Sequence, residues 1–297
     1  MGLARDSSFA ALLQVAAIML SLSLTTGAAK AQDVRFPSFD GTTQLTGVLM
    51  RPARSGTRPA VVLLHGCGGL LREGRMRAIY RSWSRIITDA GYVALVVDSA
   101  TPRGFGQTCT DSPGRTVALR DRATDAFGAL RYLQAQRFVP PDRIAAVGWS
   151  QGGSTILNTV AARSPFRPQP LDHDFRAAVA FYPGGCSDRL QQVRTGTPVG
   201  TWTTPIPLLV LFGEADNWSL AAACEELMQG AKGRGAPVEF KLYPGALHAF
   251  DAPNLSRREL PEYRLRNGTV PAIGTDPAAR ADAITRVAAF LRQHLGE

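Results

Sequence analysis

Short runs dominated by apolar residues recur along the chain and alternate with longer stretches of helical periodicity. The runs are Ala60–Leu64, Val93–Val97, Ile144–Val147, Ala177–Phe181, Pro207–Phe212 and Val238–Leu242. Strands buried on both faces of a parallel sheet have this character. The helical stretches are Arg75–Ala90, Thr116–Ala135, Gln151–Ala162, Leu220–Lys232 and Pro277–Leu295. The alternation predicts an α/β fold with a mostly parallel, doubly wound sheet.

The segment that precedes the first buried run has a different pattern. Val34–Phe39 and Gln44–Met50 alternate in polarity and are separated by Asp40-Gly41, which predicts an antiparallel N-terminal hairpin. Since no repeat or linker interrupts the rest, we expect one domain over residues 32–297. The stretch Asp251–Thr275 lacks periodicity and is expected to be a surface excursion.

Residues 1–31 are typical of a signal peptide. Arg5 supplies a positive charge, Phe9–Leu24 is apolar, and Ala29-Lys30-Ala31 has the small-x-small pattern of a cleavage site. A permanent membrane anchor is the alternative, but three polar residues interrupt a run that is already short for a bilayer span. We therefore expect an exported protein, periplasmic or secreted, with no stable membrane insertion after cleavage.

The formal net charge of +9 raises the question of an anionic partner. The basic residues are spread along the chain, with no tail or stripe of the kind that binds nucleic acid. Arg77, Arg81 and Arg85 do recur at helical spacing, and we interpret them as a solvated helix face. No nucleic-acid partner is expected, and the oligomeric state stays open.

The chain contains four cysteines, Cys67, Cys109, Cys186 and Cys224. In an exported protein they can form disulfides. Four cysteines allow three pairings. Cys109 and Cys186 each follow an apolar run, so we predict a bond between these two. Neither a Cys-x-x-Cys nor a Cys/His zinc spacing occurs, so no metal site is expected.

The most informative motif is Gly148-Trp149-Ser150-Gln151-Gly152, which lies between an apolar run and a helical stretch. In a strand–turn–helix of this kind the central residue has a strained backbone, and the flanking glycines relieve collisions between the strand and the helix. The turn exposes the Ser150 hydroxyl, and the Gln151 N–H at the helix start is placed to donate to an oxyanion. Alternatively, the glycines serve packing alone and Ser150 has no role.

A serine nucleophile needs a base and a group that orients the base. Of the four histidines, His248 follows the run Val238–Leu242, at the carboxyl edge where catalytic groups gather in open α/β sheets. Asp216 follows the preceding run and completes the chain order Ser150, Asp216, His248. Glu214 and Asp251 are rival acids because both lie close to these loops in sequence.

The segment His65-Gly66-Cys67-Gly68-Gly69 follows the first buried run and suits an oxyanion hole, because its glycines let the backbone approach a substrate closely. We expect Cys67 to contribute its backbone N–H. A phosphate-binding loop, a catalytic thiol and a purely structural turn are the alternatives. No Lys-Ser/Thr follows as in a P-loop, and a Cys67 nucleophile would leave Ser150 without a role.

Together these motifs, with Gly213-Glu214-Ala215-Asp216 and Tyr243–Asp251, resemble the dienelactone hydrolase family. The resemblance spans nearly all of residues 32–297. It implies the α/β-hydrolase fold, no cofactor, and hydrolysis of a small-molecule ester or lactone. The founding members of the family have cysteine at the position of Ser150 and are cytoplasmic. Serine and export therefore favour a general exported esterase over a true dienelactone hydrolase.

The resemblance also places Asp98–Gly104 near the substrate pocket. Arg103 is expected to bind a substrate carboxylate, unless it pairs with an acid of the protein. Trp149 and Trp218, with Phe105 and Phe250, are expected to line the pocket, although large aromatic side chains beside a turn often only pack. Two other functions stay open: a peptidase of the prolyl-oligopeptidase type, and a non-catalytic exported binding protein on the same fold.

Overall fold

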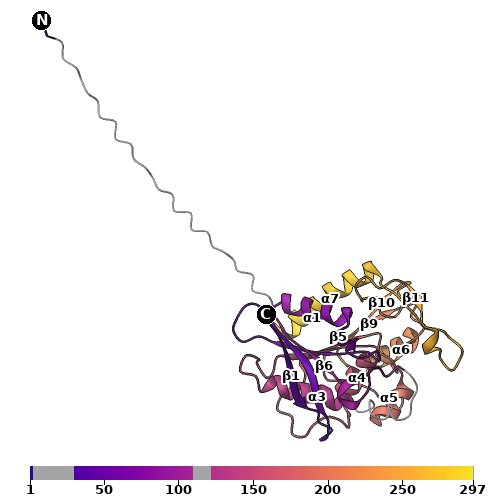
Figure 1. Cartoon of the computed structure of the whole chain (residues 1–297). Coiled ribbons are helices and arrows are strands. Elements are labelled where there is room, and N and C mark those ends of the chain that lie inside the picture. Colours follow the sequence, from indigo (N-terminus) through magenta and orange to yellow (C-terminus); the bar gives the residue numbers. More distant parts are fainter. Residues whose placement is uncertain (3–29, 110–121, 297) are drawn as a thin grey trace.

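An eight-stranded sheet runs through the centre of the computed structural model, which describes residues 1–2, 30–109 and 122–296 (Figure 1). Its strand order is β1-β2-β6-β3-β7-β8-β9-β10. The strands are β1 (Lys30–Pro37), β2 (Gln44–Arg51), β3 (Ala60–Leu64), β6 (Val93–Asp98), β7 (Ile144–Trp149), β8 (Ala177–Phe181), β9 (Leu208–Gly213) and β10 (Val238–Tyr243). The pairs β1–β2 and β2–β6 are antiparallel and all others are parallel. This confirms the predicted mostly parallel sheet with an antiparallel N-terminal hairpin.

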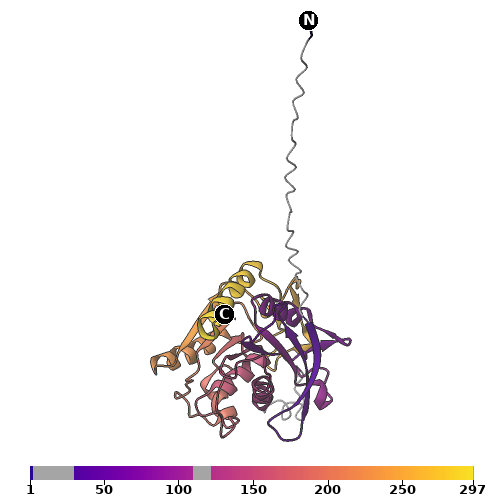
Figure 2. The same ribbon diagram turned by 90° about the vertical axis from the view of Figure 1, so that its left-hand side faces the viewer.

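Helices cover both faces of the sheet. The helices are α1 (Ala78–Asp89), α3 (Arg122–Gln134), α4 (Gln151–Val160), α5 (Asp188–Thr195), α6 (Ala221–Gly233) and α7 (Pro277–Leu295). Helices α1 and α7 lie on one face, and α3 and α4 pack together on the other (Figures 1 and 2). The central strands β3, β6, β7, β8 and β9 are buried along their whole length, which explains their continuous apolar sequences.

The start of the first helix differs from the sequence prediction. Residues Arg75–Met76 form strand β5, which pairs with β4 (Leu71–Arg72) in a short hairpin, and the helix begins at Ala78. The two residues between these strands, Glu73 and Gly74, have positive φ angles of 53° and 72°. A two-residue hairpin turn that matches the strand twist requires such angles, so this turn displaces the first residues of the predicted helix.

Two other helices, α3 and α5, also differ from what the sequence predicted. The first six residues of the predicted helix Thr116–Ala135 lie outside the described residues, and α3 is described from Arg122. Helix α5 was not predicted because its sequence is mostly polar. It depends instead on its N-cap, where the Ser187 hydroxyl accepts a hydrogen bond from the Leu190 N–H.

Most of the expected signal peptide, residues 1–31, lies outside the described residues. Its last two residues, Lys30 and Ala31, begin β1 and pair with Arg51 and Met50. Within the described part of the chain, none of the helices combines the length and the apolar character needed to cross a bilayer.

The disulfide prediction was wrong. Cys109 bonds to Cys67, and Cys186 bonds to Cys224. The strand order explains both pairs: the loops after β3 and β6 carry the first pair, the loop after β8 and the helix after β9 carry the second, and each pair of strands is adjacent. The predicted Cys109–Cys186 bond would instead join segments whose strands, β6 and β8, are three positions apart in the sheet.

Gly128 marks the closest approach between α3 and the N-terminal hairpin. A Cβ atom here would collide with the carbonyl oxygen of Pro37 and lie 3.1 Å from the Cα of Ser38. The backbone of the β1–β2 turn is therefore packed directly on the helix.

We expect Gly128→Ala to lower the free energy of unfolding by about 1–2 kcal/mol, because the collision outweighs the better helix propensity of alanine. Urea unfolding followed by circular dichroism measures this. Gly233→Ala in α6 is the control, since nothing lies within 4 Å of its Cβ position. Equal stability of the two variants would contradict the packing argument.

Candidate active site

Ser150 lies at the sharp turn between β7 and α4. Its φ of 52° and ψ of −111° are strained for a residue with a side chain. The turn is held by its backbone: the Ser150 N–H donates to the Phe181 carbonyl at 2.9 Å, and the Ser150 carbonyl accepts from Ser154 N–H at 2.8 Å. A Cβ atom on Gly152 would collide with the Leu64 carbonyl, and one on Gly148 with the backbone of Gly152. These glycines allow α4 to start directly against the sheet.

His248 and Asp216 form a buried pair. The distance from His248 Nδ1 to Asp216 Oδ2 is 2.7 Å, and each residue is only 4% exposed. The other carboxylate oxygen, Oδ1, accepts the backbone N–H groups of Trp218 and Ser219 at 2.8 and 2.9 Å. The aspartate is thereby fixed by its own loop, and the free oxygen orients the imidazole.

The rival acids have other partners. Glu214 is exposed, and its carboxylate accepts only the Gly245 N–H at 3.3 Å among the contacts of the described residues. Asp251 is fully buried and accepts hydrogen bonds from Trp83 Nε1, Trp149 Nε1 and Tyr182 Oη at 2.7, 2.8 and 2.5 Å. Asp216 is therefore the acid that the structure places against His248.

Asp251 has a structural task that the sequence did not reveal. It holds Trp149, the residue before Ser150, and Tyr182, whose ring centroid lies 4.4 Å from that of His248. Burial raises the pKa of Asp251, while the three ring donors act in the opposite direction. One buried carboxyl group thus orders the aromatic side chains beneath both the serine and the histidine.

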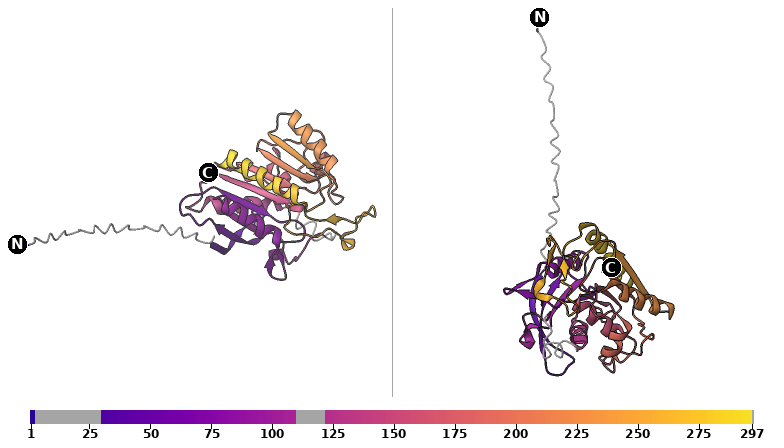
Figure 3. Two further views of the ribbon diagram at one scale, coloured as in Figure 1. Left: turned by 90° about the horizontal axis from the view of Figure 1, so that it is seen from above. Right: turned by 90° about the vertical axis from the view of Figure 1, so that its right-hand side faces the viewer.

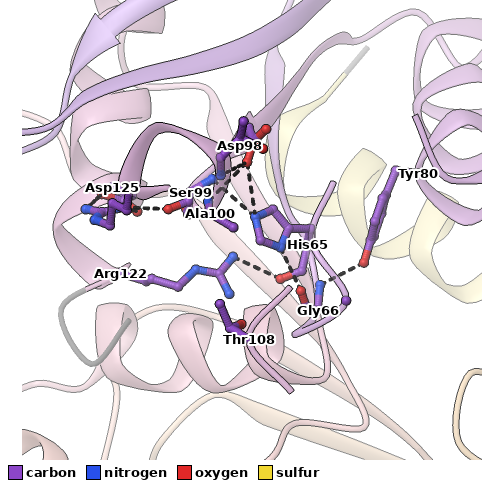
Figure 4. A network of polar contacts seen from close by, with 12 residues as sticks. His65, Gly66, Tyr80, Asp98, Ser99, Ala100, Thr108, Arg122 and Asp125 are labelled. Carbon is purple, nitrogen blue, oxygen red and sulfur yellow. Dashed lines mark hydrogen bonds and ion pairs between the residues drawn. The ribbon is translucent and has the colours of Figure 1, made fainter. Parts of the chain in front are cut away.

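The glycine-rich loop at residues 65–69 is anchored by a buried histidine (Figure 4). His65 Nδ1 lies 2.7 Å from the Gly66 carbonyl, and its Nε2 accepts the Ser99 N–H at 3.1 Å, which places the ring proton on Nδ1. The Gly66 N–H donates to Tyr80 Oη at 2.7 Å. Burial lowers the pKa of His65 well below 6.5, and the charge of Arg122 adds to this.

Arg122 connects this loop to the nucleophile turn, a role that the sequence did not suggest. Its guanidinium donates to the His65 carbonyl at 2.9 Å and to Gln151 Oε1 at 3.1 Å. Burial lowers the pKa of Arg122 to about 10, which still leaves it protonated at neutral pH. In the sequence it is one arginine among many in a helical stretch, so its burial was not visible.

Ser150 and His248 line one cavity of about 730 Å³. Cys67, Trp149 and Trp218 also line it, whereas Phe105 and Phe250 are not among the described residues that do. The Trp218 ring lies 5.1 Å from His248 and stacks on Tyr263 at 5.4 Å. Trp149 is only 1% exposed and chiefly packs against its neighbours.

The excursion between His248 and α7 forms one wall of this cavity. It contains β11 (Arg258–Glu259), the 3-10 helix η2 (Pro261–Tyr263) and β12 (Ala272–Ile273). The left view of Figure 3 shows it projecting beyond one end of the sheet. Gly274 N–H donates to the His248 carbonyl at 3.2 Å, and both amide atoms of Asn217 bond to the backbone of the excursion. The segment is therefore tied to both loops that carry the buried pair.

Arg103 pairs with acids of the protein, which is the alternative to the predicted binding of a substrate carboxylate. Both terminal nitrogens of its guanidinium donate to the buried carboxylate of Asp125, each at 2.8 Å, and one of them also donates to Asp40 at 2.9 Å. These two carboxylates occupy the terminal nitrogens of the guanidinium, which are the donors that a substrate carboxylate would need. Arg103 instead joins the N-terminal hairpin, through Asp40, to α3.

The described residues contain no group of three or more histidine, cysteine, aspartate or glutamate side chains that is suited to hold a metal ion.

His65 predicts a pH dependence of stability. Because the folded protein disfavours its protonated form, the unfolded chain alone takes up this proton as the pH falls below about 6.5, and the free energy of unfolding decreases by at most about 1.4 kcal/mol per pH unit. Urea unfolding from pH 8 to pH 5 should show a steeper loss for the wild type than for His65→Asn, with parallel curves above pH 7. Parallel curves throughout would contradict the buried neutral imidazole.

The chain is similar in sequence to known hydrolases. The model of the dienelactone hydrolase family matches residues 45–295. A probable 2-oxo-3-(5-oxofuran-2-ylidene)propanoate lactonase from Bradyrhizobium sp is 28% identical over 213 residues, which is 68% of this chain and 77% of the lactonase. The putative esterase NocK of Nocardia uniformis subsp. tsuyamanensis is 32% identical over 168 residues, 56% of this chain and 42% of the esterase.

A solved structure shows the same fold. The putative dienelactone hydrolase of Klebsiella pneumoniae subsp. pneumoniae MGH 78578 has a TM-score of 0.64 and 20% identity, and the match covers 90% of this chain and all of the other. The match includes all strands of the eight-stranded sheet except β1 and the first residue of β2, and it contains Ser150, Asp216 and His248. The chain therefore belongs to the dienelactone hydrolase family of carboxylic ester hydrolases.

Proposed function

We propose that this protein is a serine hydrolase that cleaves carboxylic esters or lactones through Ser150, His248 and Asp216. The observation that carries the proposal is the 2.7 Å contact between His248 and Asp216 on a cavity that Ser150 shares. Asp216 orients one ring nitrogen of His248, which leaves Nε2 as the nitrogen that exchanges protons with Ser150 and the substrate.

The reaction proceeds in two steps. Ser150 Oγ attacks the substrate carbonyl carbon while His248 Nε2 accepts the hydroxyl proton, and the imidazolium is stabilised by Asp216. The tetrahedral intermediate collapses, and His248 returns the proton to the leaving alcohol oxygen. Water then attacks the acyl-enzyme with His248 again as base, which releases the acid and restores Ser150.

The oxyanion is stabilised by two backbone N–H groups in this proposal. Gln151 is the first residue of α4, where an N–H has no partner within the helix. In the other loop the Gly66 N–H is engaged by Tyr80, so the next N–H along the chain, that of Cys67, is the donor. Both positions supply a partial positive charge where the carbonyl oxygen becomes negative.

Two observations support the wider proposal of an exported esterase or lactonase. The two disulfides fit an oxidising compartment, which agrees with cleavage of residues 1–31 and location in the periplasm or outside the cell. The relatives that the chain matches include proteins named as a lactonase and an esterase.

The charge around the cavity favours an anionic substrate. Four exposed arginines stand against two exposed glutamates among the lining residues, namely Arg72, Arg75, Arg81 and Arg258 against Glu73 and Glu262. The lactonase relative is named for a substrate that carries a carboxylate. We therefore propose an ester or lactone with a carboxylate away from the scissile bond.

The triad is tested by variants of Ser150 and Asp216, with a variant of the neighbouring acid Glu214 as the control. Ser150→Ala and Asp216→Asn should each lower kcat on a p-nitrophenyl ester by about 10⁴ or more, with the Tm close to that of the wild type. Glu214→Gln, in the same loop as Asp216, should keep wild-type kcat. Activity that survives in Ser150→Ala, or that is lost in Glu214→Gln but not in Asp216→Asn, would overturn the assignment.

The same preparation separates the two other functions. A peptidase would hydrolyse the matching amide as well as the ester, although more slowly, whereas we expect cleavage of the ester and no measurable cleavage of the amide. A binding protein without catalysis would leave Ser150 unlabelled by a fluorophosphonate probe.

The anionic preference is tested with charge and salt. At low salt we expect p-nitrophenyl hemisuccinate to exceed p-nitrophenyl acetate in kcat/KM by about tenfold, and the ratio to approach one near 1 M salt, where the Debye length is about 3 Å. Arg75→Glu should reduce the ratio at low salt. Arg85→Glu, an exposed arginine of α1 outside the cavity, is the control. A ratio of kcat/KM values that changes neither with salt nor in Arg75→Glu would contradict the proposal of an anionic substrate.

A further inference from the structure

Thr108 and Cys109, which we call the strap, join the two segments that carry the proposed oxyanion donors. The Thr108 N–H donates to the Cys67 carbonyl at 2.6 Å. The Thr108 hydroxyl lies 2.8 Å from Gln151 Oε1 and 3.2 Å from the same Cys67 carbonyl. Cys109 is bonded to Cys67 by a disulfide. Two consecutive residues therefore contact both donor residues.

The strap is part of a closed set of contacts. Gln151 Oε1 accepts hydrogen bonds from both Thr108 and Arg122. Arg122 also donates to the carbonyl of His65, two residues before Cys67 (Figure 4). The loop after β3 is therefore connected to the first residue of α4 twice, once through Thr108 and once through Arg122. Thr108 is 7% exposed and Arg122 is 1% exposed, so these hydrogen bonds are shielded from competing water.

The two donors need such a connection because they belong to different elements. Gln151 is fixed at the start of α4, whereas Cys67 lies in a loop with glycine at 66, 68 and 69, and glycine gives the backbone many accessible conformations. An oxyanion hole works only if both N–H groups lie about 2.7–3.1 Å from the developing oxyanion. A small displacement of the loop would therefore remove one donor while the triad stays intact.

We propose that Thr108 and Cys109 are positioning residues that set the separation of the Cys67 and Gln151 N–H groups. The proposal rests on the proposed function, because it assumes that these N–H groups stabilise the oxyanion. The strap touches no reacting atom and acts only through the two donors. Its contribution is accordingly to the stabilisation of the tetrahedral intermediate and not to the binding of the substrate.

The second disulfide provides a matched control. Cys186 and Cys224 are separated by 38 residues and Cys67 and Cys109 by 42, so both bonds restrict the unfolded chain to nearly the same extent. Both pairs lie in segments that follow parallel strands of the sheet, but only Cys67 and Cys109 line the cavity. A disulfide that merely staples the fold would behave like Cys186–Cys224.

The experiment measures kcat, KM and Tm for the double variants Cys67→Ser/Cys109→Ser and Cys186→Ser/Cys224→Ser, on a p-nitrophenyl ester well below both Tm values. We expect similar decreases in Tm for both. Only loss of the Cys67–Cys109 bond should lower kcat, by about 10- to 100-fold, with KM nearly unchanged, since loss of a whole donor costs about 10²- to 10³-fold. A trifluoromethyl ketone, which mimics the tetrahedral intermediate, should bind that variant more weakly by a similar factor.

A second pair of variants keeps both disulfides in place. Thr108→Val removes the hydroxyl that reaches Gln151, whereas Thr108→Ser retains it. We expect kcat and the affinity for the trifluoromethyl ketone to fall several-fold in Thr108→Val and to recover in Thr108→Ser. This pair also decides the matter if the first double variant fails to fold.

Three results would overturn the proposal: equal losses of kcat in both disulfide variants, unchanged kcat without the Cys67–Cys109 bond, or equal kcat in Thr108→Val and Thr108→Ser. Each of these leaves the triad untouched, because Ser150→Ala would still be inactive. Failure of the proposed function has a different signature, namely activity in Ser150→Ala.

Discussion

The tight turn at Ser150, between β7 and α4, is the constraint on which the site depends. A serine with φ of 52° carries a backbone cost of about 1–3 kcal/mol, and the surrounding hydrogen bonds must maintain it. The neighbouring strand supplies one of them through the Phe181 carbonyl, and the Ser150 carbonyl accepts two more, from Ser154 and Gly184. Because glycine stands at 148 and 152, the helix begins directly against the sheet, at the residue after the serine.

Two aspartates support the site in different ways. Asp216 holds His248 directly and is itself fixed by two backbone N–H groups of its own loop. Asp251 lies beneath, in an environment of aromatic rings, and accepts three hydrogen bonds from them. The first carboxylate contacts the imidazole of His248, and in the proposed mechanism it stabilises the protonated form of that ring, whereas the second orders uncharged rings. The two acids are close in sequence to the same loops, yet their surroundings give them separate tasks.

The sequence predicted the features that depend on local pattern. Buried strands are continuous in apolar residues, so Ala60–Leu64 and Ala177–Phe181 were located to the residue. The approximate positions of Ser150, Asp216 and His248 followed from their places after such strands, since the carboxyl ends of parallel strands share one edge. Local pattern also implied a hairpin at the N-terminus, where the strands are exposed on one face.

Features that depend on long-range contacts were not accessible in this way. Arg103 finds its partners 63 and 22 residues away in the chain, and nothing near it in sequence distinguishes a substrate ligand from the link between a hairpin and a helix. The disulfide pairs follow the order of strands in the sheet, which adjacent residues do not encode. Arg122 and Asp251 are charged residues inside the protein, and their burial is a property of the packing.

The excursion between His248 and α7 has a consequence for how this scaffold can change. Its residues 270–274 are fastened to the histidine loop and to the Asn217 side chain by hydrogen bonds to their own backbone, which do not depend on the identity of most of the side chains of the excursion. The residues that it turns toward the cavity, such as Arg258 and Tyr263, belong neither to the sheet nor to the nucleophile turn. Under the proposed function, substitutions in the excursion therefore change one wall of the substrate cavity and leave the nucleophile turn and the sheet unaltered.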